Sequence, residues 1–440
     1  MTILEWIENY RQQIKHEIER IPFSEMKEWK FQEGNIQRDD KSFFSIKAAT
    51  SDHIEMADTV IVHQPEIGIL GFILCIQENE LYILLHAKSE PGNINLTQIG
   101  PSVQATESNY NKKHSGRPTP FINLFTQEGD HTIFSIKQSE QGNRFFNKYN
   151  RNVAVLVDTI DVEDQDNKFK WFKLDEVVKY LNEPHLFNTD FKSVIAHLFE
   201  FLMPDESVSG DEFTKSLIDS YKNKNAGTAQ ALLNKIEKSR SENKFKSQLI
   251  PLNELSEWDG NSCKLLSNEA HFNFDYFEVT LYDRERIHWK QPLITKESTE
   301  KLVLIVGMHE GVLSMVFKER YEIGYTNYFQ LGPTLQYDEY TTDVPIGQGR
   351  LLFSFQQSEE GGRFYKNNSI YAVCQKENLD EYVDSKVYYI LNLQEVFDML
   401  KITGVLTNES RTMIASFIPY ALTDYNIKSL KAKTTQLTDI

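Results

Sequence analysis

One polar string occurs twice in this chain of 440 residues. Residues 138–145 read Gln-Ser-Glu-Gln-Gly-Asn-Arg-Phe, and residues 357–364 read Gln-Ser-Glu-Glu-Gly-Gly-Arg-Phe. An arginine in such a string can bind a phosphate with two parallel hydrogen bonds. A glutamate can act as an acid or a base if burial raises its pKa. The alternative is a helix start, with Ser139 as the N-cap and Glu140 in the first turn. Because polar residues recur as well as apolar ones, we favour a binding or catalytic site.

A cation and a carboxylate two residues apart also occur twice. Lys88 and Glu90 lie in Lys-Ser-Glu-Pro-Gly-Asn, and Arg320 and Glu322 occupy the same positions in the second copy. The proline and glycine predict a turn that holds the carboxylate at a strand end. A surface salt bridge would explain the pair structurally, but such bridges contribute little stability. Glu90 and Lys88, together with Glu140 of the polar string, are therefore the catalytic candidates, and the structural explanation stays open.

Two further anchors extend the likeness between the copies. Residues 98–104 (Gln-Ile-Gly-Pro-Ser-Val-Gln) match residues 330–336, and the Ile-Pro at 21–22 matches the Ile-Pro at 250–251. Matches in the same order indicate a tandem duplication. We predict a first repeat with an N-terminal docking helix over residues 1–204, a helical linker over 205–248, a second repeat over 249–425 and a polar tail over 426–440. In the docking helix, Leu4, Ile7, Ile14 and Ile18 are expected to share the buried face.

Hydrophobic periodicity predicts the same elements in each copy. Strands at 68–76 and 81–85 form a hairpin, further strands follow at 132–136 and 153–157, and helices at 174–181 and 190–201 close the unit. The second copy repeats them at 302–306, 312–317, 351–355, 370–374, 393–400 and 409–418. Strands first and helices last indicate an α+β fold, a mixed sheet with flanking helices.

Composition limits the classes of function. The formal net charge of −17 argues against binding to duplex nucleic acid. The chain has no apolar run long enough to span a membrane. The scattered cysteines, Cys75, Cys263 and Cys374, suggest a reducing cytoplasm. Because no metal-ligand spacing, dinucleotide-binding fingerprint or phosphate-binding loop is present, we expect neither a metal nor a cofactor.

These strings resemble the sugar-nucleotide 2,3-dehydratases of deoxysugar biosynthesis, which act on nucleoside-diphosphate 4-keto-6-deoxyhexoses, usually thymidine-linked. The likeness lies in Gln-Pro-Glu-Ile-Gly-Ile-Leu-Gly at 64–71, Ala-Lys-Ser-Glu-Pro-Gly-Asn at 87–93, Pro-Ser-Val-Gln-Ala-Thr at 101–106, Ser-Asn-Tyr at 108–110 and both polar strings. It covers residues 4–420. The resemblance implies a duplicated pair of Nudix-like units and a homodimer. The magnesium-binding box of Nudix hydrolases is missing from both copies, which disfavours a hydrolase.

The resemblance also implies a reaction that needs no cofactor. The ketone at carbon 4 acidifies the hydrogen on carbon 3, a base removes it, and the hydroxyl on carbon 2 leaves with help from an acid. Glu90 or Glu140 would be the base, and Lys88 would donate to the enolate oxygen or to the leaving hydroxyl. A nicotinamide-dependent 3-ketoreductase would take the unstable diketone product. The expected substrate-binding residues are Asn93, Gln104, Asn109, Tyr110, Arg117, Gln138, Ser139 and Arg144, with Arg117 and Arg144 on the diphosphate and Tyr110 stacked on the base or sugar.

Each copy lacks something that the family pattern contains. The pattern has Trp-x-Gln-Pro near the start of the strands, and the second copy keeps it at 289–292, whereas the first has Met-Ala-Asp-Thr at 56–59. The second copy in turn lacks the Asn-Tyr and has Tyr325 in place of Asn93. We place the working site in the first repeat. A non-catalytic sugar-nucleotide binding module and a site composed from both halves stay open. The predicted second pocket, a remnant or accessory one, contains Arg320, Glu322, Gln336, Gln357, Ser358, Glu359 and Arg363.

Overall fold

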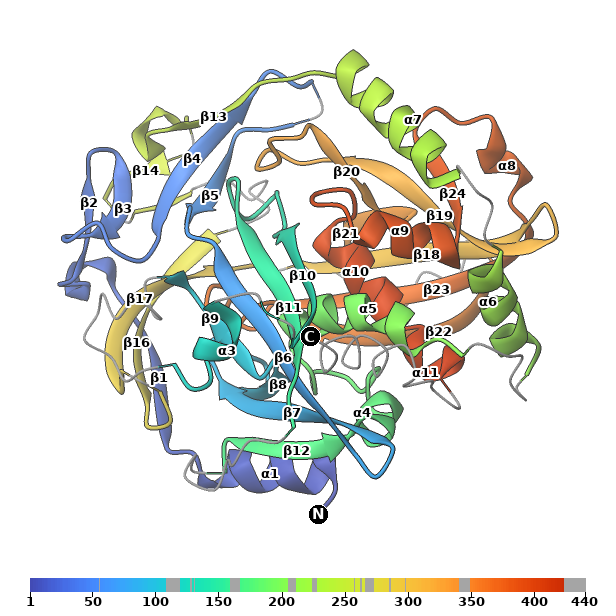
Figure 1. The fold of residues 1–440 in the computed structure, drawn as a ribbon. Coiled ribbons are helices and arrows are strands. Elements are labelled where there is room, and N and C mark those ends of the chain that lie inside the picture. Colours follow the sequence, from blue (N-terminus) through green and yellow to red (C-terminus); the bar gives the residue numbers. More distant parts are fainter. Residues whose placement is uncertain are drawn as a thin grey trace.

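The computed structural model describes residues 1–54, 56–107, 119–126, 129, 131–158, 167–204, 211–223, 228–256, 258–261, 263–265, 273–284, 286–296, 298–339 and 349–422. It is a mixed α+β structure with two similar halves (Figure 1), each built on a seven-stranded sheet. The first sheet contains β6 (Gly68–Gln77), β7 (Glu80–Ser89), β8 (Thr97–Gly100), β9 (Val103–Ala105), β10 (Thr132–Ser139), β11 (Tyr149–Leu156) and β12 (Phe169–Lys173). The second contains β18 (Thr299–His309), β19 (Val312–Tyr321), β20 (Phe329–Gly332), β21 (Leu335–Glu339), β22 (Arg350–Ser358), β23 (Asn368–Asn378) and β24 (Tyr388–Asn392).

The two sheets have the same strand order. It is β10-β11-β6-β7-β12 in the first and β22-β23-β18-β19-β24 in the second. In both, the central pair of strands forms the predicted hairpin through a two-residue turn with positive φ. The φ angles are 49° and 64° at Glu78 and Asn79, and 50° and 79° at Glu310 and Gly311. Such turns match the twist of the paired strands. Strand β11 lies parallel to β6, and β23 lies parallel to β18, so both sheets are mixed.

Helices close each half as the periodicity predicts. They are α4 (Leu174–Lys179) and α5 (Thr189–Leu202) in the first half, and α9 (Leu393–Leu400) and α10 (Asn408–Ala415) in the second. Asn188 caps α5 by accepting the amide of Phe191, and Thr407 caps α10 by accepting the amide of Ser410. The apolar side chains of these helices and of both sheets form one continuous core. Helices α5 and α10 pack against each other between the two sheets (Figure 1).

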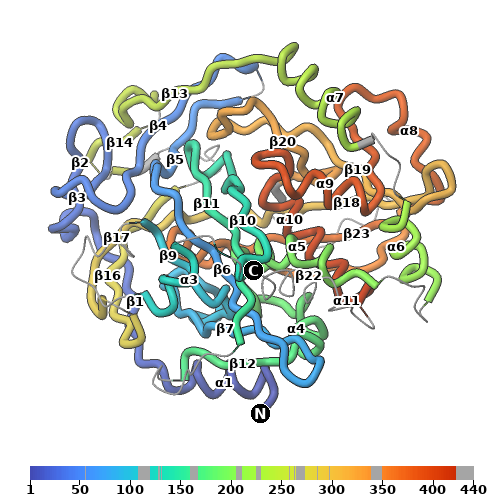
Figure 2. Tube along the Cα trace, viewed as in Figure 1, coloured from blue at the N-terminus to red at the C-terminus, as the bar shows by residue number. Residues whose placement is uncertain are grey.

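The halves exchange their first strands. Strand β1 (His16–Ile21) pairs with β16 (Asn273–Leu281) of the second half, and β13 (Ser247–Ile250) pairs with β4 (Ser45–Ser51) of the first. Figure 2 shows both crossings, with β1 beside β16 and β13 beside β4. The resulting small sheets are completed by β2 (Trp29–Gln32), β3 (Asn35–Arg38), β5 (Thr59–His63) and β17 (His288–Thr295). The two halves are therefore joined in space by exchanged strands, and the domain boundaries expected from the sequence stay a prediction.

Helix α1 (Ile3–Gln13) docks on the first half, with Thr2 and Glu5 forming a capping box. Its buried face is Ile3, Trp6, Ile7 and Tyr10, whereas Leu4 is 38% exposed. The expected face with Leu4, Ile14 and Ile18 is wrong in this respect, because the helix ends at Gln13 and residue 18 lies in β1.

The predicted linker contains α6 (Glu212–Lys222) and α7 (Thr228–Glu242). Helix α7 has the place in the second half that α1 has in the first. Arg11 donates from Nε to the carbonyl of Thr97 at 2.9 Å, and Arg240 donates from Nη2 to the carbonyl of Phe329 at 2.9 Å. These two carbonyls begin equivalent strands. The likeness between the two halves thus includes the docking helix.

Short elements complete the described part of the chain. They are the 3-10 turns η1 (Phe23–Glu25) and η2 (Leu252–Glu254), strands β14 (Trp258–Asp259) and β15 (Lys264–Leu265), and helices α3 (Asn123–Thr126), α8 (Asp380–Val383) and α11 (Ile418–Ala421). All three cysteines are buried and carry free thiols. No helix in the described part of the chain is long and apolar enough to cross a membrane.

Candidate active site

Two loops at equivalent positions each touch the polar string of the other repeat. Gly92 donates its backbone N–H to the carbonyl of Gly361 at 2.8 Å, and Gly324 donates to the carbonyl of Gly142 at 2.7 Å. A Cβ on Gly92 would lie 1.7 Å from the carbonyl oxygen of Phe364, so only glycine permits this approach. Two composite sites result. We call the one around Glu90 the first site and the one around Glu322 the second site.

The first site is centred on a buried ion pair. Lys88 Nζ lies 2.9 Å from Glu90 Oε1, and their side chains are 8% and 4% exposed. The other carboxylate oxygen, Oε2, is buried and has no hydrogen-bond partner among the described residues. Burial by itself would raise the pKa of Glu90, but the charges of Lys88, Arg284 and Arg363 outweigh it and hold this pKa below its usual value. The site therefore presents an ionised carboxylate with one unused oxygen.

The second repeat brings Glu360 and Arg363 to the same place. A Cβ built on Gly362 would lie 2.8 Å from Glu360 Oε1 and 3.5 Å from Glu90 Oε1, so both carboxyl groups face this glycine. Burial, followed by the charge of Glu90, raises the pKa of Glu360 against the opposing charge of Arg363. Arg363 donates from Nη2 to Gln64 Oε1 of the first repeat at 3.0 Å. Glu360 and Gln64 were not singled out in the sequence. The signal for Glu360 was available, because it is the one carboxyl that distinguishes the second polar string from the first.

Glu140, at the end of β10, extends the carboxyl cluster of the first site. Its Oε1 accepts the amide of Asn150 at 2.7 Å, and its Oε2 accepts the amide of Asn408 at 3.1 Å. Burial raises the pKa of Glu140, and the charge of Glu360 adds to the rise. Asp190, at the start of α5, is buried beside these groups, and burial together with Glu140 and Glu360 raises its pKa far above the usual value.

The Trp-x-Gln-Pro motif that the second repeat keeps at 289–292 is hydrogen-bonded to the loop that carries Glu360. Trp289 donates its indole N–H to Gln291 Oε1 at 2.8 Å, and Gln291 donates its amide to the carbonyl of Gly362 at 2.9 Å. The strand that carries this motif is β17. Its counterpart in the first half, β5, lies against the loop that carries Arg144, and Val62 of β5 donates its backbone N–H to the carbonyl of Arg144 at 2.9 Å. The first repeat's departure from Trp-x-Gln-Pro therefore affects the second site. Tyr325, which stands where the first copy has Asn93, also lies at the second site, against Gly142.

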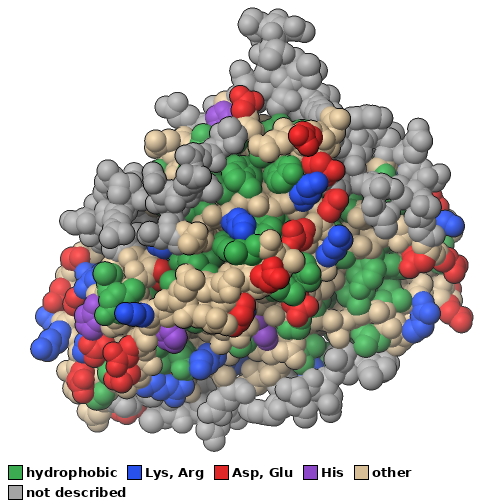
Figure 3. Space-filling view, turned by 90° about the horizontal axis from the view of Figure 1, so that it is seen from below, with side chains coloured by type: hydrophobic (Ala, Val, Ile, Leu, Met, Phe, Trp, Pro, Cys, Tyr) green, Lys and Arg blue, Asp and Glu red, His purple; other side chains and the backbone are tan. Residues whose placement is uncertain are grey.

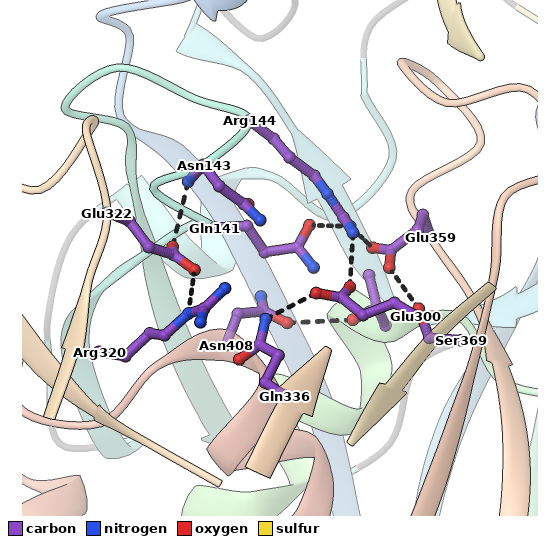
Figure 4. Close-up of polar contacts among 11 residues, drawn as sticks. Gln141, Asn143, Arg144, Glu300, Arg320, Glu322, Gln336, Glu359, Ser369 and Asn408 are labelled. Carbon is purple, nitrogen blue, oxygen red and sulfur yellow. Dashed lines mark hydrogen bonds and ion pairs between the residues drawn. The ribbon is translucent and has the colours of Figure 1, made fainter. Parts of the chain in front are cut away.

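In the second site, charges of the protein neutralise one another (Figure 4). Arg144 places Nη2 2.7 Å from Glu300 Oε2 and Nη1 2.5 Å from Glu359 Oε2, with its side chain 1% exposed. Nη1 also donates to Gln141 Oε1 at 2.9 Å. Gln336 donates its amide to the second oxygen of Glu300 at 2.7 Å. Arg144 is thus held within the protein by two carboxylates and an amide.

The cation–carboxylate pair of the second site is also engaged. Arg320 Nε lies 3.2 Å from Glu322 Oε1, and Glu322 Oε2 accepts the backbone N–H of Asn143 at 3.1 Å. Nearby Glu409 is fully buried, and neither of its carboxyl oxygens has a hydrogen-bond partner in the described part of the chain. Burial, with the charges of Glu322 and Glu300, raises the pKa of Glu409 to about 8.

The remaining expected residues that the structure describes fall into two groups. Gln138 and Ser139 donate to the carbonyl of Leu400 and to Gln330 of the other repeat, Gln357 donates to the carbonyl of Phe187, and Gln98 donates to Ser358, so these residues join the halves. Asn93 and Gln104 lie in the first site, where Gln104 accepts the amide of Asn188 at 3.0 Å.

Relative to the expectation from the sequence, Arg144 and Arg363 have exchanged sites. Each loop reaches across to the other repeat, so Arg144 lies in the second site and Arg363 in the first. The expected substrate residues Asn109, Tyr110 and Arg117 lie outside the described residues.

The outer surface carries charges of both signs. Figure 3 shows the face seen from below, where the described Asp and Glu side chains are interspersed with Lys and Arg side chains. A basic stripe of the kind that follows a nucleic-acid backbone is not formed by the described side chains of this face.

Comparisons with known proteins agree with this architecture. A family model described as NDP-hexose 2,3-dehydratase matches residues 1–198 and 229–417, which includes most of α7. Three curated relatives are named dTDP-4-dehydro-6-deoxy-alpha-D-glucopyranose 2,3-dehydratase. The protein from Saccharopolyspora spinosa is 26% identical over 93% of this chain and 90% of its own length. Those from Amycolatopsis orientalis and Streptomyces violaceoruber are 27% and 26% identical, over 93% and 91% of this chain and 88% and 93% of their own lengths. With a match over most of its length, the chain belongs to the NDP-hexose 2,3-dehydratase family.

Proposed function

We propose that this chain removes water across carbons 2 and 3 of a dTDP-linked 4-keto-6-deoxyglucose and yields the 3,4-diketo-2,6-dideoxy sugar nucleotide. Its curated relatives are named for this substrate and this reaction. The observation that carries the proposal is the buried Lys88–Glu90 pair, because Glu90 combines a lowered pKa with one carboxylate oxygen that lacks a protein partner.

Glu90 is the proposed base. Its ionised form at neutral pH can accept the hydrogen from carbon 3, which the neighbouring ketone has made acidic. Negative charge then develops on the oxygen at carbon 4. Lys88, 2.9 Å from Glu90, is a proposed donor to that oxygen, because a fixed ammonium in a poorly hydrated site stabilises charge as it forms. The substrate's own ketone is the electron sink.

The binding of the rest of the substrate is assigned by resemblance and by position. Asn93 and Gln104 are proposed to bind sugar hydroxyls at the first site. Tyr110 and Arg117 are proposed to bind the nucleotide, and Asn109 a hydroxyl. Arg144 is not proposed to bind the diphosphate, because its guanidinium is already paired with two carboxylates.

Several finer features of the family are proposed together. The two halves are Nudix-like units, and the protein is a homodimer. Because an α-diketone is reactive, a nicotinamide-dependent 3-ketoreductase is the proposed partner that takes the product. A reducing compartment such as the cytoplasm fits the three free, buried thiols.

A binding module without turnover was the alternative drawn from the sequence. It rested on the missing Trp-x-Gln-Pro of the first repeat. Since the retained copy, through Gln291, braces Gly362 of the first site, that loss does not argue against chemistry there.

The test is direct turnover. Purified protein is incubated with the 4-keto-6-deoxyglucose nucleotide, a 3-ketoreductase and reduced nicotinamide, and the products are resolved by chromatography and mass spectrometry. We expect a nucleotide sugar that lacks the carbon-2 oxygen. If no such product forms while a relative from Streptomyces violaceoruber gives it in a parallel reaction, the proposed function is rejected. Release of nucleoside monophosphate would instead indicate a hydrolase.

A further inference from the structure

We propose that Glu360, which the second repeat contributes, is the general acid that protonates the hydroxyl leaving carbon 2, so that the active site is complete only when both repeats are present. This inference rests on the proposed function. It adds a catalytic residue that lies on the other repeat from Glu90, and it divides the reaction between two carboxyl groups.

The geometry places Glu360 where a second proton carrier is needed. Glu360 Oε1 and Glu90 Oε1 lie 2.8 and 3.5 Å from one point, the position of a Cβ on Gly362. Because residue 362 is glycine, the carboxyl of Glu360 can lie against its backbone, close to Glu90 Oε1. Burial and neighbouring charges act on the carboxyl of Glu360 without a hydrogen bond from a described residue, and the residue is only partly buried. Its carboxyl can therefore turn toward a ligand beside Glu90.

The other carboxyl groups of the first site are less free to donate a proton. Both oxygens of Glu140 accept amide hydrogens, from Asn150 and Asn408. A turn of this carboxyl toward a ligand would break both hydrogen bonds. Asp190, at the start of α5, is only 4% exposed, so it is less accessible to a ligand than Glu360. Of the three described carboxyl groups Glu140, Asp190 and Glu360, Glu360 is the one that is partly exposed and accepts no hydrogen bond from a described residue.

The second site supplies an internal comparison. The residue at the position of Glu360 is Gln141, which carries an amide and accepts a hydrogen bond from Arg144 at 2.9 Å. An amide cannot deliver a proton to a leaving group. The equivalent of Lys88 there is Arg320, engaged with Glu322. The same fold therefore holds a dissociable acid at the first site and a neutral amide at the second.

The charges around Glu90 and Glu360 shift the pKa values of the two carboxyl groups in opposite directions. Glu90 faces Lys88, Arg284 and Arg363, and its pKa is lowered. Burial and the charge of Glu90 raise the pKa of Glu360, against Arg363, Lys88 and Lys148. Two carboxyl groups whose environments separate their pKa values in this way are suited to act as base and acid.

The protons balance over one turnover. Glu90 takes the hydrogen of carbon 3, and the electron pair of that bond moves toward the ketone. The carbon–oxygen bond at carbon 2 then breaks, and Glu360 gives its proton to the departing hydroxide, so water forms. The enol ketonises by gaining a proton at carbon 2 and losing one from the oxygen at carbon 3. One proton passed from Glu90 to Glu360 through solvent restores the starting state.

The first experiment separates the two proton transfers. In heavy water, exchange of the hydrogen on carbon 3 reports the base, and formation of the 2-deoxy product reports the acid. We expect Glu360→Gln to keep the exchange and to lose roughly 10²–10⁴-fold in elimination, the usual contribution of a general acid. Glu90→Gln is expected to lose both. A folded Glu360→Gln variant that eliminates at the original rate, or that loses exchange together with elimination, overturns the assignment.

The second experiment removes the need for an acid. Fluoride leaves carbon 2 without being protonated, so a substrate analogue with fluorine in place of the carbon-2 hydroxyl bypasses Glu360. Glu360→Gln is expected to release fluoride from the analogue at close to the rate of the unaltered protein, whereas Glu90→Gln is not. Failure of this rescue overturns the proposal even if hydroxyl elimination is lost.

Two milder variants guard against a merely structural effect. Glu360→Asp keeps the acid and should retain more elimination than Glu360→Gln. Gly362→Ala places a Cβ 2.8 Å from Glu360 Oε1 but at an ordinary 3.5 Å from Glu90 Oε1, so it should slow elimination more than exchange. Equal loss of both steps in Gly362→Ala counts against the proposal. If the unaltered protein gives no elimination at all, the proposed function fails, which is a separate outcome.

Discussion

The backbone N–H of Gly92 donates to the carbonyl of Gly361 at 2.8 Å across the boundary between the two repeats. This bond fixes the loop that carries Glu90 against the loop that carries Glu360. The equivalent bond at the second site, from Gly324 to Gly142, fixes the loop that carries Glu322 against the loop that carries Arg144. The position of each loop depends on a hydrogen bond to the other repeat, so a change at either glycine affects both repeats.

Substitution of Gly92 by alanine should separate the loops. The new Cβ would lie 1.7 Å from a backbone carbonyl, which cannot yield as a flexible side chain does. We expect unfolding free energy to fall by about 1–3 kcal/mol, as for other overpacked sites, and elimination to fall more than tenfold. Chemical denaturation and product assays measure the two effects. Gly260→Ala is the matched control, because its Cβ would meet only Trp258 Nε1, at 3.9 Å.

The two equivalent carboxylates should respond differently to the same change. Glu90→Gln is expected to reduce kcat by roughly 10²–10⁴-fold, because a general base contributes about that much. Glu322→Gln is expected to lower thermal stability, since it weakens the contact with Arg320, and to keep elimination. Steady-state kinetics and thermal unfolding distinguish the two. Loss of turnover in Glu322→Gln with Glu90→Gln still active would move the working site to the second repeat.

Arg144 is expected to be structural. Arg144→Met leaves Glu300 and Glu359 buried without their cation, which should cost about 3–5 kcal/mol of unfolding free energy. Adding Glu300→Gln to that variant should recover part of the loss, because one unpaired charge is removed. Urea unfolding measures both. If Arg144 instead held the substrate diphosphate, KM would rise while stability stayed close to that of the unaltered protein.

Glu409 should make stability depend on pH. Its pKa rises from an ordinary 4.5 to about 8 in the folded protein, so between these values the folded state holds a proton that the unfolded state has lost. Its contribution is fully present below pH 4.5 and is lost as pH rises through 8.

Glu409→Gln keeps a neutral side chain at every pH. The variant should therefore gain stability relative to the unaltered protein between pH 5 and pH 9, by up to a few kcal/mol, since one pKa unit corresponds to about 1.4 kcal/mol. Unfolding free energies measured across that range provide the check, with the exposed Glu78→Gln as control. A difference that does not change with pH contradicts the prediction.

Hairpins and helices could be predicted from the sequence, because residues that are close in the sequence determine them. The hairpins at residues 77–80 and 308–311 follow from apolar strands that flank a polar turn. Helices α5 and α9 follow from apolar residues three and four apart. The face of α1 was not predicted, because helical spacing fits more than one stripe. The sheet beneath selects Ile3, Trp6, Ile7 and Tyr10 and leaves Leu4 outside.

The exchange of strands could not be predicted from one chain. Strands β1 and β13 end in the same Ile-Pro, so either could pair with β4 or β16 through the same backbone hydrogen bonds. Periodicity contains no information on which copy is chosen. For the same reason, the sequence grouped Arg144 with the loop of Glu90 and Arg363 with the loop of Glu322, whereas the structure groups them the other way round.

The exchange also dictates when the molecule can become complete during synthesis. Ala49 of β4 pairs with Leu249, and Ile18 of β1 pairs with Val279. While the first repeat leaves the ribosome, β1 and one edge of β4 have no partner, because β13 and β16 have not yet been made. Unpaired strand edges invite association with other chains. We therefore expect the nascent first repeat to be the stage of synthesis at which this protein is most prone to associate with other chains.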